Sequence, residues 1–573
     1  MSLSFNRTPV LHRRIPQGRA WVLLGFVLLG LGALGGRAAY LQLVNEEFLQ
    51  EQADARMMRV LQRAAPRGAV YDRHGTALAM SAPVSVVAVR PAQVVLDARG
   101  TRALAEALEM PLGDVQAKLR SERPYLYLSK GVSPAQAKKV LALEVPGVEV
   151  TEAMRRFYPL GGAAAQVVGV TGNDGPGVEG VERRYNDLLT GSDGARRVIR
   201  SRRGAVVAEL EMLAEPVPGQ DVRLTIDARL QSIVSAALVK AVDTYSAEAA
   251  SAVVLDARTG QVLAMASAPT YNPNDARQRN GEAMRNRALT DRYEPGSTLK
   301  PFVVAMALAS GRYSPQTLME LEGGRLSIGG RTIRDAHPHE RLSIFEVLQK
   351  SSNVGAAKLA MAFSPQHMWQ VYHDIGLGEL TGLDFPGESA GYMREAKRWK
   401  PVEQVTMSYG HGIAVTLAQV ARAYTVFANE GRLLPLSLLA EDAEPTPPAA
   451  PVFPREVVAQ VNEMLEAVVS KGGTAPQAAI RGYRVGGKTG TTHKIENGRY
   501  VNKYVGSFVG LAPMDAPRFI VAVAVDDPQG RQYYGGLTAA PVFATIMEQA
   551  LRLYQVPADY ALLSAQAPKG SAP

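Results

Sequence analysis

The chain has 573 residues, of which 46% are hydrophobic and 20% are charged, so it has the composition of a folded protein and a length that requires two or more domains. It contains no cysteine, which excludes a disulfide scaffold. The formal net charge of +9 suits a nucleic acid, an anionic membrane or a wall polymer, but the sequence has no zinc-finger spacing and no dense Lys/Arg tract with interleaved aromatics, so we expect no nucleic acid as a partner.

The first predicted element is a membrane anchor. Residues 20–36 form an uncharged, mostly apolar run of 17 residues between Arg19 and Arg37. A helix that crosses a bilayer needs ~20 apolar residues, with a lower limit of ~17. Residues 38–43 can extend the span when the Arg37 side chain reaches the interface. The sequence therefore predicts a spanning helix over residues 20–44.

The charges on either side of the anchor predict its orientation. Arginines precede the apolar run, and Glu46, Glu47 and Glu51 follow it. This bias places residues 1–19 in the cytoplasm and the bulk of the chain outside. A cleaved signal peptide is the alternative, because Gly36-Arg37-Ala38 resembles a small-x-small cleavage site. The apolar run is longer than a usual signal-peptide core, so a retained anchor is favoured.

The segment after the anchor is predicted to mix strands and helices. Residues 49–61 are polar and indicate a juxtamembrane helix or stalk. Ser133 followed by Pro134 is typical of a helix start. The other expected elements are a short strand that ends in a turn at His74-Gly75, strands over 84–89 and 148–152, and a helical segment over 101–122 interrupted at Pro111. The charged segments 155–159 and 177–182 are interpreted mainly as structural turns and ion pairs.

A domain boundary is predicted near residue 220, where the turn 219–221 precedes an alternating strand over 222–227 and then a helix. The segments 252–256 and 261–266 predict a hairpin. Helical patterns follow around Ser297, over 343–361 and over 415–429, and two strands return over 505–512 and 519–525. Strands first, helices next and strands last predict an antiparallel sheet with a helical layer, an α+β fold. Residues 441–454 indicate a flexible loop.

A serine and a lysine three residues apart, Ser297 and Lys300, open an apolar run after the turn Pro295-Gly296. Residues i and i+3 share one face of a helix, so Lys300 Nζ can reach Ser297 Oγ. A serine hydroxyl becomes a good nucleophile when a neighbouring base takes its proton, and a desolvated lysine can be that base. The alternative without a catalytic role is a serine at a helix start and an exposed lysine.

Two further motifs follow in order, Ser351-Ser352-Asn353 and Lys488-Thr489-Gly490-Thr491. Ser-x-x-Lys, Ser-x-Asn and Lys-Thr-Gly in this order are the signature of penicillin-binding proteins and serine β-lactamases. In this chemistry Ser297 attacks a peptide carbonyl with Lys300 as its base, Ser351 relays a proton to the leaving amine, and Asn353 orients Lys300 and the substrate.

The third motif is predicted to bind the substrate. Lys488 supplies positive charge near a free carboxylate, to which the hydroxyls of Thr489 and Thr491 can donate. Gly490 allows a substrate strand to approach closely. Backbone N–H groups of Ser297 and Thr491 are expected to hold the oxyanion. Ser352 is assigned to substrate binding with these residues.

Two other patterns are set aside. Gly482 to Thr489 match the phosphate-binding loop Gly-x-x-x-x-Gly-Lys-[Ser/Thr], but that loop must open a helix, and the turn-rich residues that follow do not predict one. His337-Pro338-His339 could suggest a metal, but a third spaced ligand is missing from the sequence, so we interpret both histidines as loop residues and expect no metal.

The chain resembles the class B penicillin-binding proteins of the cell-division type from the anchor to about residue 550. Ser352 in the middle of its motif matches the division branch, since the elongation branch usually carries Asp there. His74 and His411 depart from the family, which commonly has Asn and Tyr at these positions. The other segments that carry the resemblance are 67–75, 156–159, 177–185, 408–412 with 415–416, 533–536 and 540–541.

This resemblance implies a division into five parts: a cytoplasmic tail (1–19), a transmembrane anchor (20–44), a non-catalytic pedestal or dimerisation domain (45–220), a transpeptidase domain (221–563) and a disordered tail (564–573). It implies D-Ala-D-Ala stem peptides of peptidoglycan as donors, an acyl-enzyme on Ser297, inhibition by β-lactams and no cofactor. It also implies a septal glycan polymerase and other division proteins as partners of the anchor and N-terminal domain.

The implied location is the bacterial inner membrane at the division septum, with a single pass, a cytoplasmic N-terminus and a periplasmic bulk. One alternative is a catalytically idle division scaffold or β-lactam sensor of the same fold; the intact motif set argues against an idle scaffold. A β-lactamase is a second alternative, but a pedestal of ~200 residues and an anchor exceed what a small hydrolase domain needs.

Overall fold

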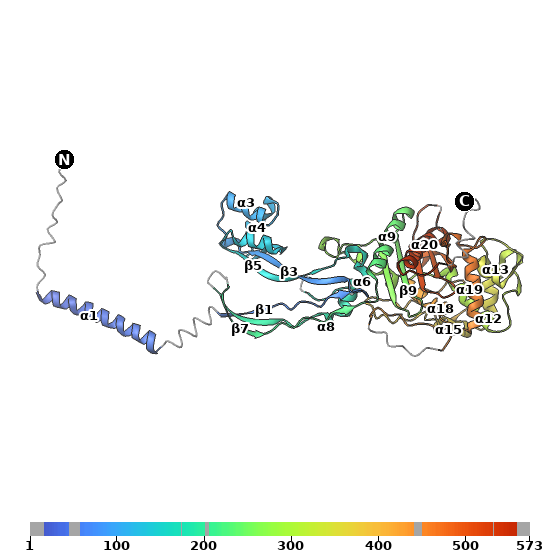
Figure 1. The fold of residues 1–573 in the computed structure, drawn as a ribbon, viewed down its shortest axis with the longest axis horizontal. Coiled ribbons are helices and arrows are strands. Elements are labelled where there is room, and N and C mark those ends of the chain that lie inside the picture. The colour runs from blue at the N-terminus through green and yellow to red at the C-terminus, as the bar shows by residue number, and fades with distance from the viewer. Residues whose placement is uncertain are drawn as a thin grey trace, which may run out of the picture. The chain divides into compact units, whose positions relative to one another are not determined.

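The computed structural model describes residues 17–44, 58–172, 175–200, 206–440, 450–530 and 532–558 (Figure 1). The predicted tails, apart from residues 17–19, and most of the predicted loop over 441–454 lie outside these residues. Contacts divide the chain into two compact units, one of Met1–Ala65, Val84–Ala153 and Ser192–Val217, and one of Pro66–Pro83, Met154–Gly191 and Pro218–Pro573.

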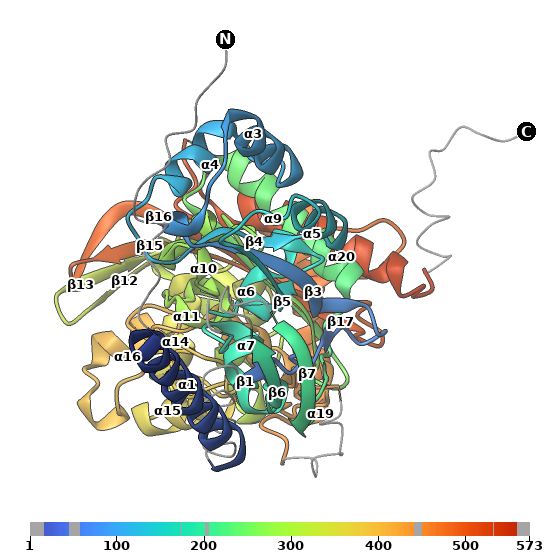
Figure 2. The ribbon, with the colours of Figure 1, turned by 90° about the vertical axis from the view of Figure 1, so that its left-hand side faces the viewer.

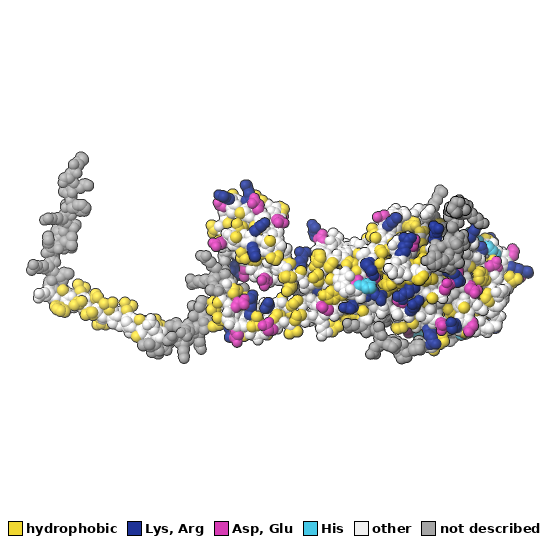
Figure 3. All heavy atoms as spheres, in the orientation of Figure 1, with side chains coloured by type: hydrophobic (Ala, Val, Ile, Leu, Met, Phe, Trp, Pro, Cys, Tyr) yellow, Lys and Arg dark blue, Asp and Glu magenta, His cyan; other side chains and the backbone are white. Residues whose placement is uncertain are grey.

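The predicted anchor is a helix. α1 (Gln17–Ala39) has 23 residues and continues into the π-helical turn Tyr40–Val44. At 1.5 Å per residue α1 is about 35 Å long, enough to cross a hydrocarbon core of about 30 Å. Its side chains are apolar along most of its length and are exposed (Figure 3). Within the described residues, Gln17–Gln42 is the one helix long and apolar enough to cross a membrane.

The first unit contains a three-stranded antiparallel sheet in the order β1-β6-β7: β1 (Met58–Arg63), β6 (Gly194–Arg200) and β7 (Val206–Ala214). The alternative of a helix over 49–61 is therefore wrong for residues 58–61, because these pair with Arg196–Ile199 of β6, and the alternative of a stalk stays a prediction. Residues 49–57 lie outside the described residues. A partner strand more than 130 residues away along the chain leaves no trace in the local pattern of residues 58–63.

Three helices form the rest of this unit: α3 (Ala98–Ala107), α4 (Leu112–Leu119) and α5 (Pro134–Leu141). They share a core that includes Val87, Leu104 and Leu128 with β4 (Leu126–Val132) and the end of β3 (Ala77–Val89). Figure 2 shows α3 and α4 side by side. The predicted break at Pro111 is confirmed, as is the start of α5, where Ser133 and Gln136 form a capping box.

The second unit begins with short elements that precede its main sheet. Their bounds are β2 (Val70–Tyr71), α6 (Ala165–Val168), α7 (Gly180–Arg184), α8 (Asn186–Leu189) and β8 (Val222–Arg223), with β5 (Val148–Phe157) paired to β3. The carboxylate of Glu182 is fully buried between Arg67 and Arg156, whose Nε atoms lie 2.7 and 2.6 Å from its oxygens. The predicted ion pairs of segments 155–159 and 177–182 are therefore confirmed, although residues 155–157 are strand rather than turn.

The main sheet has five antiparallel strands in the order β10-β9-β17-β16-β15. Their bounds are β9 (Ala249–Asp256), β10 (Val262–Ala268), β15 (Gly486–Glu496), β16 (Arg499–Ala512) and β17 (Phe519–Asp526). The predicted hairpin of β9 and β10 and the two late strands are confirmed. The strand β15 was not predicted, because its glycines and polar residues hide the pattern of a strand.

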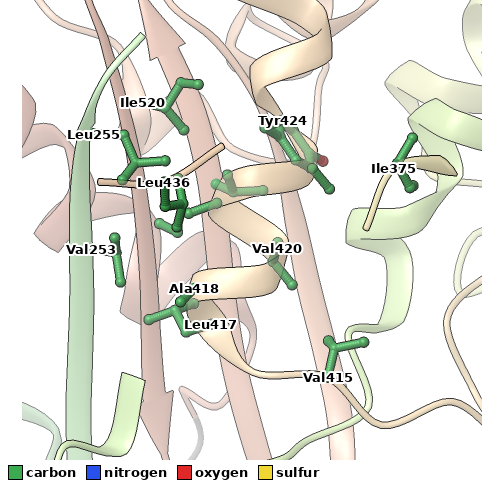
Figure 4. Packing of buried hydrophobic residues seen from close by; sticks show 14 of the residues in the cluster. Val253, Leu255, Ile375, Val415, Leu417, Ala418, Val420, Tyr424, Leu436 and Ile520 are labelled. Carbon is green, nitrogen blue, oxygen red and sulfur yellow. The ribbon is translucent and has the colours of Figure 1, made fainter. Parts of the chain in front are cut away.

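Helices cover both faces of this sheet, and alternate strand residues face opposite sides. Val254 and Val521 pack with α9 (Ala228–Tyr245) and α20 (Gly535–Leu553) on one face. Val253, Leu255 and Ile520 pack on the other face with α17 (Leu417–Ala423) and its neighbours (Figure 4). The fold is α+β, as predicted.

The remaining elements of the second unit surround these layers and carry two of the three motifs. They are α10 (Gly281–Met284), α11 (Arg287–Thr290), the 3₁₀ turn Gly296–Leu299, α12 (Lys300–Ala309), β11 (Leu318–Glu320), β12 (Arg325–Ile328), β13 (Arg331–Arg334), β14 (Arg341–Ser343), α13 (Ile344–Gln349), α14 (Asn353–Met361), α15 (Pro365–Asp374), α16 (Pro401–Met407), α18 (Thr425–Ala428) and α19 (Arg455–Val469).

Candidate active site

The turn that carries Ser297 joins a buried segment to α12. Gly296 has a φ of +58°, which favours glycine, and its N–H donates to Gly410 O at 3.2 Å. The 3₁₀ turn is followed by α12, which begins at Lys300. Pro301 fits the first turn of this helix because backbone N–H groups there have no acceptor within the helix, so the missing N–H of proline costs no hydrogen bond. Ser297 is half-buried, whereas Lys300 is completely buried.

The Lys300 ammonium is surrounded by the second motif. Its Nζ donates to Ser351 O at 2.6 Å, to Ser351 Oγ at 3.1 Å and to Asn353 Oδ1 at 2.7 Å. Protonated Lys300 has three N–H donors, one for each of these acceptors, whereas the neutral amine has two and a lone pair that can take a proton. Among the described residues no hydrogen bond joins Lys300 Nζ to Ser297 Oγ, which differs from the contact expected from their helical spacing.

The second motif is held by an aspartate that the sequence analysis missed. Asp335 Oδ1 accepts from the N–H groups of Asn353 and Val354, at 2.5 and 2.9 Å, and its Oδ2 accepts from Ser352 Oγ at 2.6 Å. Asp335 directly follows β13 and is 17 residues before Ser352, a spacing that matches no motif. Ser351, at the centre of the cluster, has a φ of +60°.

The Ser352 side chain is bound within the protein. Its side chain caps α14 by accepting from Gly355 N at 2.9 Å, and only 3% of the residue is exposed. Both hydrogen-bonding roles of the hydroxyl are thus filled within the protein. The geometry supports a structural role for Ser352, and the substrate contact expected from the sequence stays a prediction.

The third motif lies on β15, at the edge of the main sheet. Lys488 is completely buried, and its Nζ donates to Ser351 Oγ at 3.0 Å and to Thr489 Oγ1 at 3.2 Å. Thr491 Oγ1 accepts from Gly535 N at 3.0 Å, which leaves its O–H available as a donor.

Gly490 is needed for contact within the protein itself. A Cβ at this position would lie 2.4 Å from Ser507 Oγ and 2.8 Å from Pro295 O. The missing side chain therefore lets β15 pack against the turn before Ser297, and the approach of a substrate strand at Gly490 stays a prediction.

Burial shifts the pKa values of both lysines downward. Desolvation, and then the nearby Lys488 charge, lowers the pKa of Lys300 well below its usual range, although Asp335 opposes the shift. Desolvation lowers the pKa of Lys488 to about 7. The downward shift of the Lys300 pKa favours its neutral amine, the form that a general base requires.

In the loop 337–339, His339 Nδ1 lies 3.1 Å from His337 O. Within the described residues, no group of three His, Cys, Asp or Glu side chains could hold a metal ion. The site described above is built from serine, lysine, asparagine and threonine, the groups used in serine acyl transfer.

Comparison with known proteins gives the same domain order. The penicillin-binding protein dimerisation domain matches residues 62–224, and the penicillin-binding protein transpeptidase domain matches residues 250–548. The peptidoglycan D,D-transpeptidase FtsI of Escherichia coli (strain K12) is 40% identical over 557 residues, which cover 96% of this chain and 94% of that protein. The probable peptidoglycan D,D-transpeptidase PenA of Neisseria gonorrhoeae is 39% identical over 540 residues, 92% of each.

Solved structures agree with this relationship. The transpeptidase domain of penicillin-binding protein 3 from Burkholderia pseudomallei has a TM-score of 0.53 and 44% identity, and covers 58% of this chain and 97% of its own. A peptidoglycan synthetase from Bifidobacterium adolescentis has a TM-score of 0.68 and 26% identity, and covers 88% of this chain and 98% of its own.

The fold and the three motifs together define a serine-type, penicillin-binding transpeptidase. With the N-terminal dimerisation domain and the similarity over nearly its whole length, the chain belongs to the class B penicillin-binding proteins of the cell-division type, the peptidoglycan D,D-transpeptidases. The family resemblance inferred from the motifs is confirmed.

Proposed function

We propose that this enzyme cross-links septal peptidoglycan through an acyl-enzyme on Ser297. Ser297 Oγ attacks the carbonyl of the penultimate D-Ala of a stem peptide, and its proton passes to neutral Lys300. The tetrahedral intermediate collapses, the peptide bond breaks, and the leaving D-Ala amine takes a proton through Ser351. The amine of a neighbouring stem peptide then attacks the ester, forms the new amide and releases Ser297.

The other motif residues bind and orient in this proposal. Asn353 holds Lys300 through its amide oxygen, while Lys488 and the Thr491 hydroxyl bind the terminal carboxylate of the donor peptide. The Thr489 hydroxyl accepts a hydrogen bond from Lys488 Nζ at 3.2 Å and contributes to the same subsite. Backbone N–H groups of Ser297 and Thr491 stabilise the oxyanion. β-Lactams acylate Ser297 in the same way because they carry a strained amide and a carboxylate.

The observation that carries the proposal is the convergence on Ser351. Two buried lysines from different elements, Lys300 and Lys488, donate to one serine hydroxyl beside the turn of Ser297. Burying two amines costs free energy, and a catalytic use accounts for keeping them. An idle scaffold does not need this arrangement. The test is covalent labelling by a fluorescent penicillin, which requires Ser297.

The proposal extends to location and partners. Helix α1 is placed in the inner membrane with a cytoplasmic N-terminus, so that the catalytic unit lies in the periplasm at the division septum. A glycan polymerase and other division proteins bind α1 and the N-terminal domain. A fluorescent fusion in a dividing cell tests this location: a band at midcell supports it, and an even distribution along the membrane contradicts it.

A further inference from the structure

A buried carboxylate lies three residues before Ser297 and takes no part in the mechanism above. Glu294 is 6% exposed. Its Oε1 accepts from Gly412 N at 2.7 Å, and its Oε1 and Oε2 accept from Tyr500 OH at 3.0 and 3.1 Å. His411 Nδ1 lies 3.0 Å from Oε2. The carboxylate therefore has partners on two segments that are far from it in sequence.

These partners connect the Ser297 turn to both strands of the β15–β16 hairpin. Tyr500 is on β16, and its hydroxyl binds the Glu294 side chain. Thr492 is on β15, and its Oγ1 donates to the main-chain oxygen of Glu294 at 3.0 Å. Because Thr491 precedes Thr492 on the same strand, the position of β15 relative to Ser297 depends on these bonds.

The loop 410–412 is fixed to the same turn from another direction. Gly410 O accepts from Gly296 N, and Gly412 N donates to the Glu294 carboxylate. A Cβ at Gly410 would lie 2.1 Å from Gly296 O, so the two segments touch backbone to backbone. Glu294 thus holds a three-way junction in which the nucleophile turn, the loop 410–412 and the hairpin meet.

The charge of Glu294 is retained at this junction. Burial raises the pKa of a carboxyl group, but hydrogen bonds from His411, Gly412 and Tyr500 outweigh that effect, and the pKa of Glu294 lies below its usual range. An ionised carboxylate accepts stronger hydrogen bonds than an amide does. A charged acceptor therefore stabilises the junction. Removing the charge weakens the hydrogen bonds that hold the junction together and leaves no cavity.

We propose that Glu294 is a positioning residue for acylation, which fixes the Ser297 hydroxyl relative to the β15 strand through Tyr500, His411 and the loop 410–412. The proposal rests on Ser297 as the nucleophile. A displacement of ~1 Å between reacting groups can cost ~10²-fold in rate. The partners of the Glu294 carboxylate are groups of the protein itself. Its loss therefore lowers the rate of acylation and leaves the first binding step unchanged.

The test separates these two steps. The rate constant of acylation, k2, and the dissociation constant of the first complex, Ks, are measured for a fluorescent penicillin with the full chain in detergent. The variants are Tyr500→Phe, which removes one hydroxyl from a residue that is 57% exposed, and Glu294→Gln, which removes the charge and keeps the shape. Tyr483→Phe is the matched control, because its hydroxyl donates to Val556 O, away from this junction.

We expect k2 to fall about fivefold or more in Tyr500→Phe and further in Glu294→Gln, with Ks within twofold of wild type and an unchanged melting temperature for Tyr500→Phe. Tyr483→Phe keeps the wild-type k2. An unchanged k2 in Tyr500→Phe and Glu294→Gln, or a change confined to Ks, overturns the positioning role. Failure of the proposed function is a different result, in which Ser297→Ala still becomes labelled.

Discussion

Lys300 and Lys488 donate to the same acceptor, the hydroxyl oxygen of Ser351, at 3.1 and 3.0 Å. Both amines are completely buried, and each has a pKa below its usual range. Two buried like charges that share one oxygen repel each other, so the pair favours a state with a single charge. We assign the neutral form to Lys300, which becomes the base, and the charge to Lys488, which meets the substrate carboxylate.

This assignment predicts a bell-shaped dependence of k2/Ks on pH. As the pH falls through the lowered pKa of Lys300, the base becomes protonated and acylation is lost. As the pH rises above about 7, Lys488 loses its proton and carboxylate binding weakens. Rapid-mixing measurements of penicillin acylation between pH 5 and pH 10 check both limbs.

The control for the alkaline limb is Lys488→Arg, because a guanidinium stays protonated over this whole range. We expect its overall rate to be lower, since the buried site is shaped for lysine, but its alkaline limb to disappear. A wild-type profile without an alkaline limb between pH 6 and pH 9 contradicts the assignment of the charge to Lys488.

Asp335 is predicted to support the second motif. Asp335→Ala leaves the N–H groups of Asn353 and Val354 without their acceptor, and we expect the free energy of unfolding to fall by about 1–3 kcal/mol. Acylation by penicillin should slow roughly tenfold because Asn353 no longer orients Lys300. Chemical denaturation and labelling rates measure the two effects. Asp374→Ala, which removes an exposed carboxylate, is the control. Equal unfolding free energies and equal labelling rates in the two variants argue against a supporting role for Asp335.

The buried carboxylate of Glu182 is predicted to be essential for stability. Glu182→Ala leaves the guanidinium groups of Arg67 and Arg156 buried without an anion, which costs about 3–5 kcal/mol when one partner of a buried pair is removed. Thermal unfolding of the purified protein measures the loss. The exposed Glu122→Ala should melt like wild type. A Glu182→Ala variant with an unchanged melting temperature contradicts the prediction.

The sequence predicted the parts that depend on local spacing. Ser297 and Lys300 open a helical segment as predicted, with Ser297 in the 3₁₀ turn before α12, Pro111 interrupts a helical segment, and β9 and β10 form the expected hairpin. The five-residue set Ser297, Lys300, Ser351, Asn353 and Lys488 was selected because three weak motifs occur in order. Four of its members are joined through the Lys300 and Ser351 hydrogen bonds.

The parts that depend on distant pairing were not predictable. The bond between Glu294 and Tyr500 spans 206 residues, and neither residue belongs to a motif. The strand β1 forms because β6 supplies its partner, and β15 is a strand despite its glycines because it packs against β16 and the Ser297 turn. All three features depend on contacts between residues that are far apart in the sequence, and a short stretch of sequence does not contain such contacts.

Deletion of the anchor is predicted to release the protein from membranes. Helix α1 is exposed and apolar, whereas the two domains have cores of their own. A chain that begins at residue 58 should stay soluble without detergent and keep penicillin labelling, while the full chain should sediment with membranes and resist extraction by high salt. Release of the full chain by salt alone contradicts a spanning helix.

The most direct test of the account is the site of covalent labelling. Wild type, Ser297→Ala and Ser310→Ala are incubated with a fluorescent penicillin, and the adduct is located by mass spectrometry of the digested protein. Ser310 lies just after α12, and its hydroxyl donates to Ala307 O, so its loss is a matched removal of one hydroxyl. We predict one adduct on Ser297 in wild type and Ser310→Ala, and none in Ser297→Ala with an unchanged melting temperature. An adduct on any other residue, or persistent labelling of Ser297→Ala, contradicts the central claim.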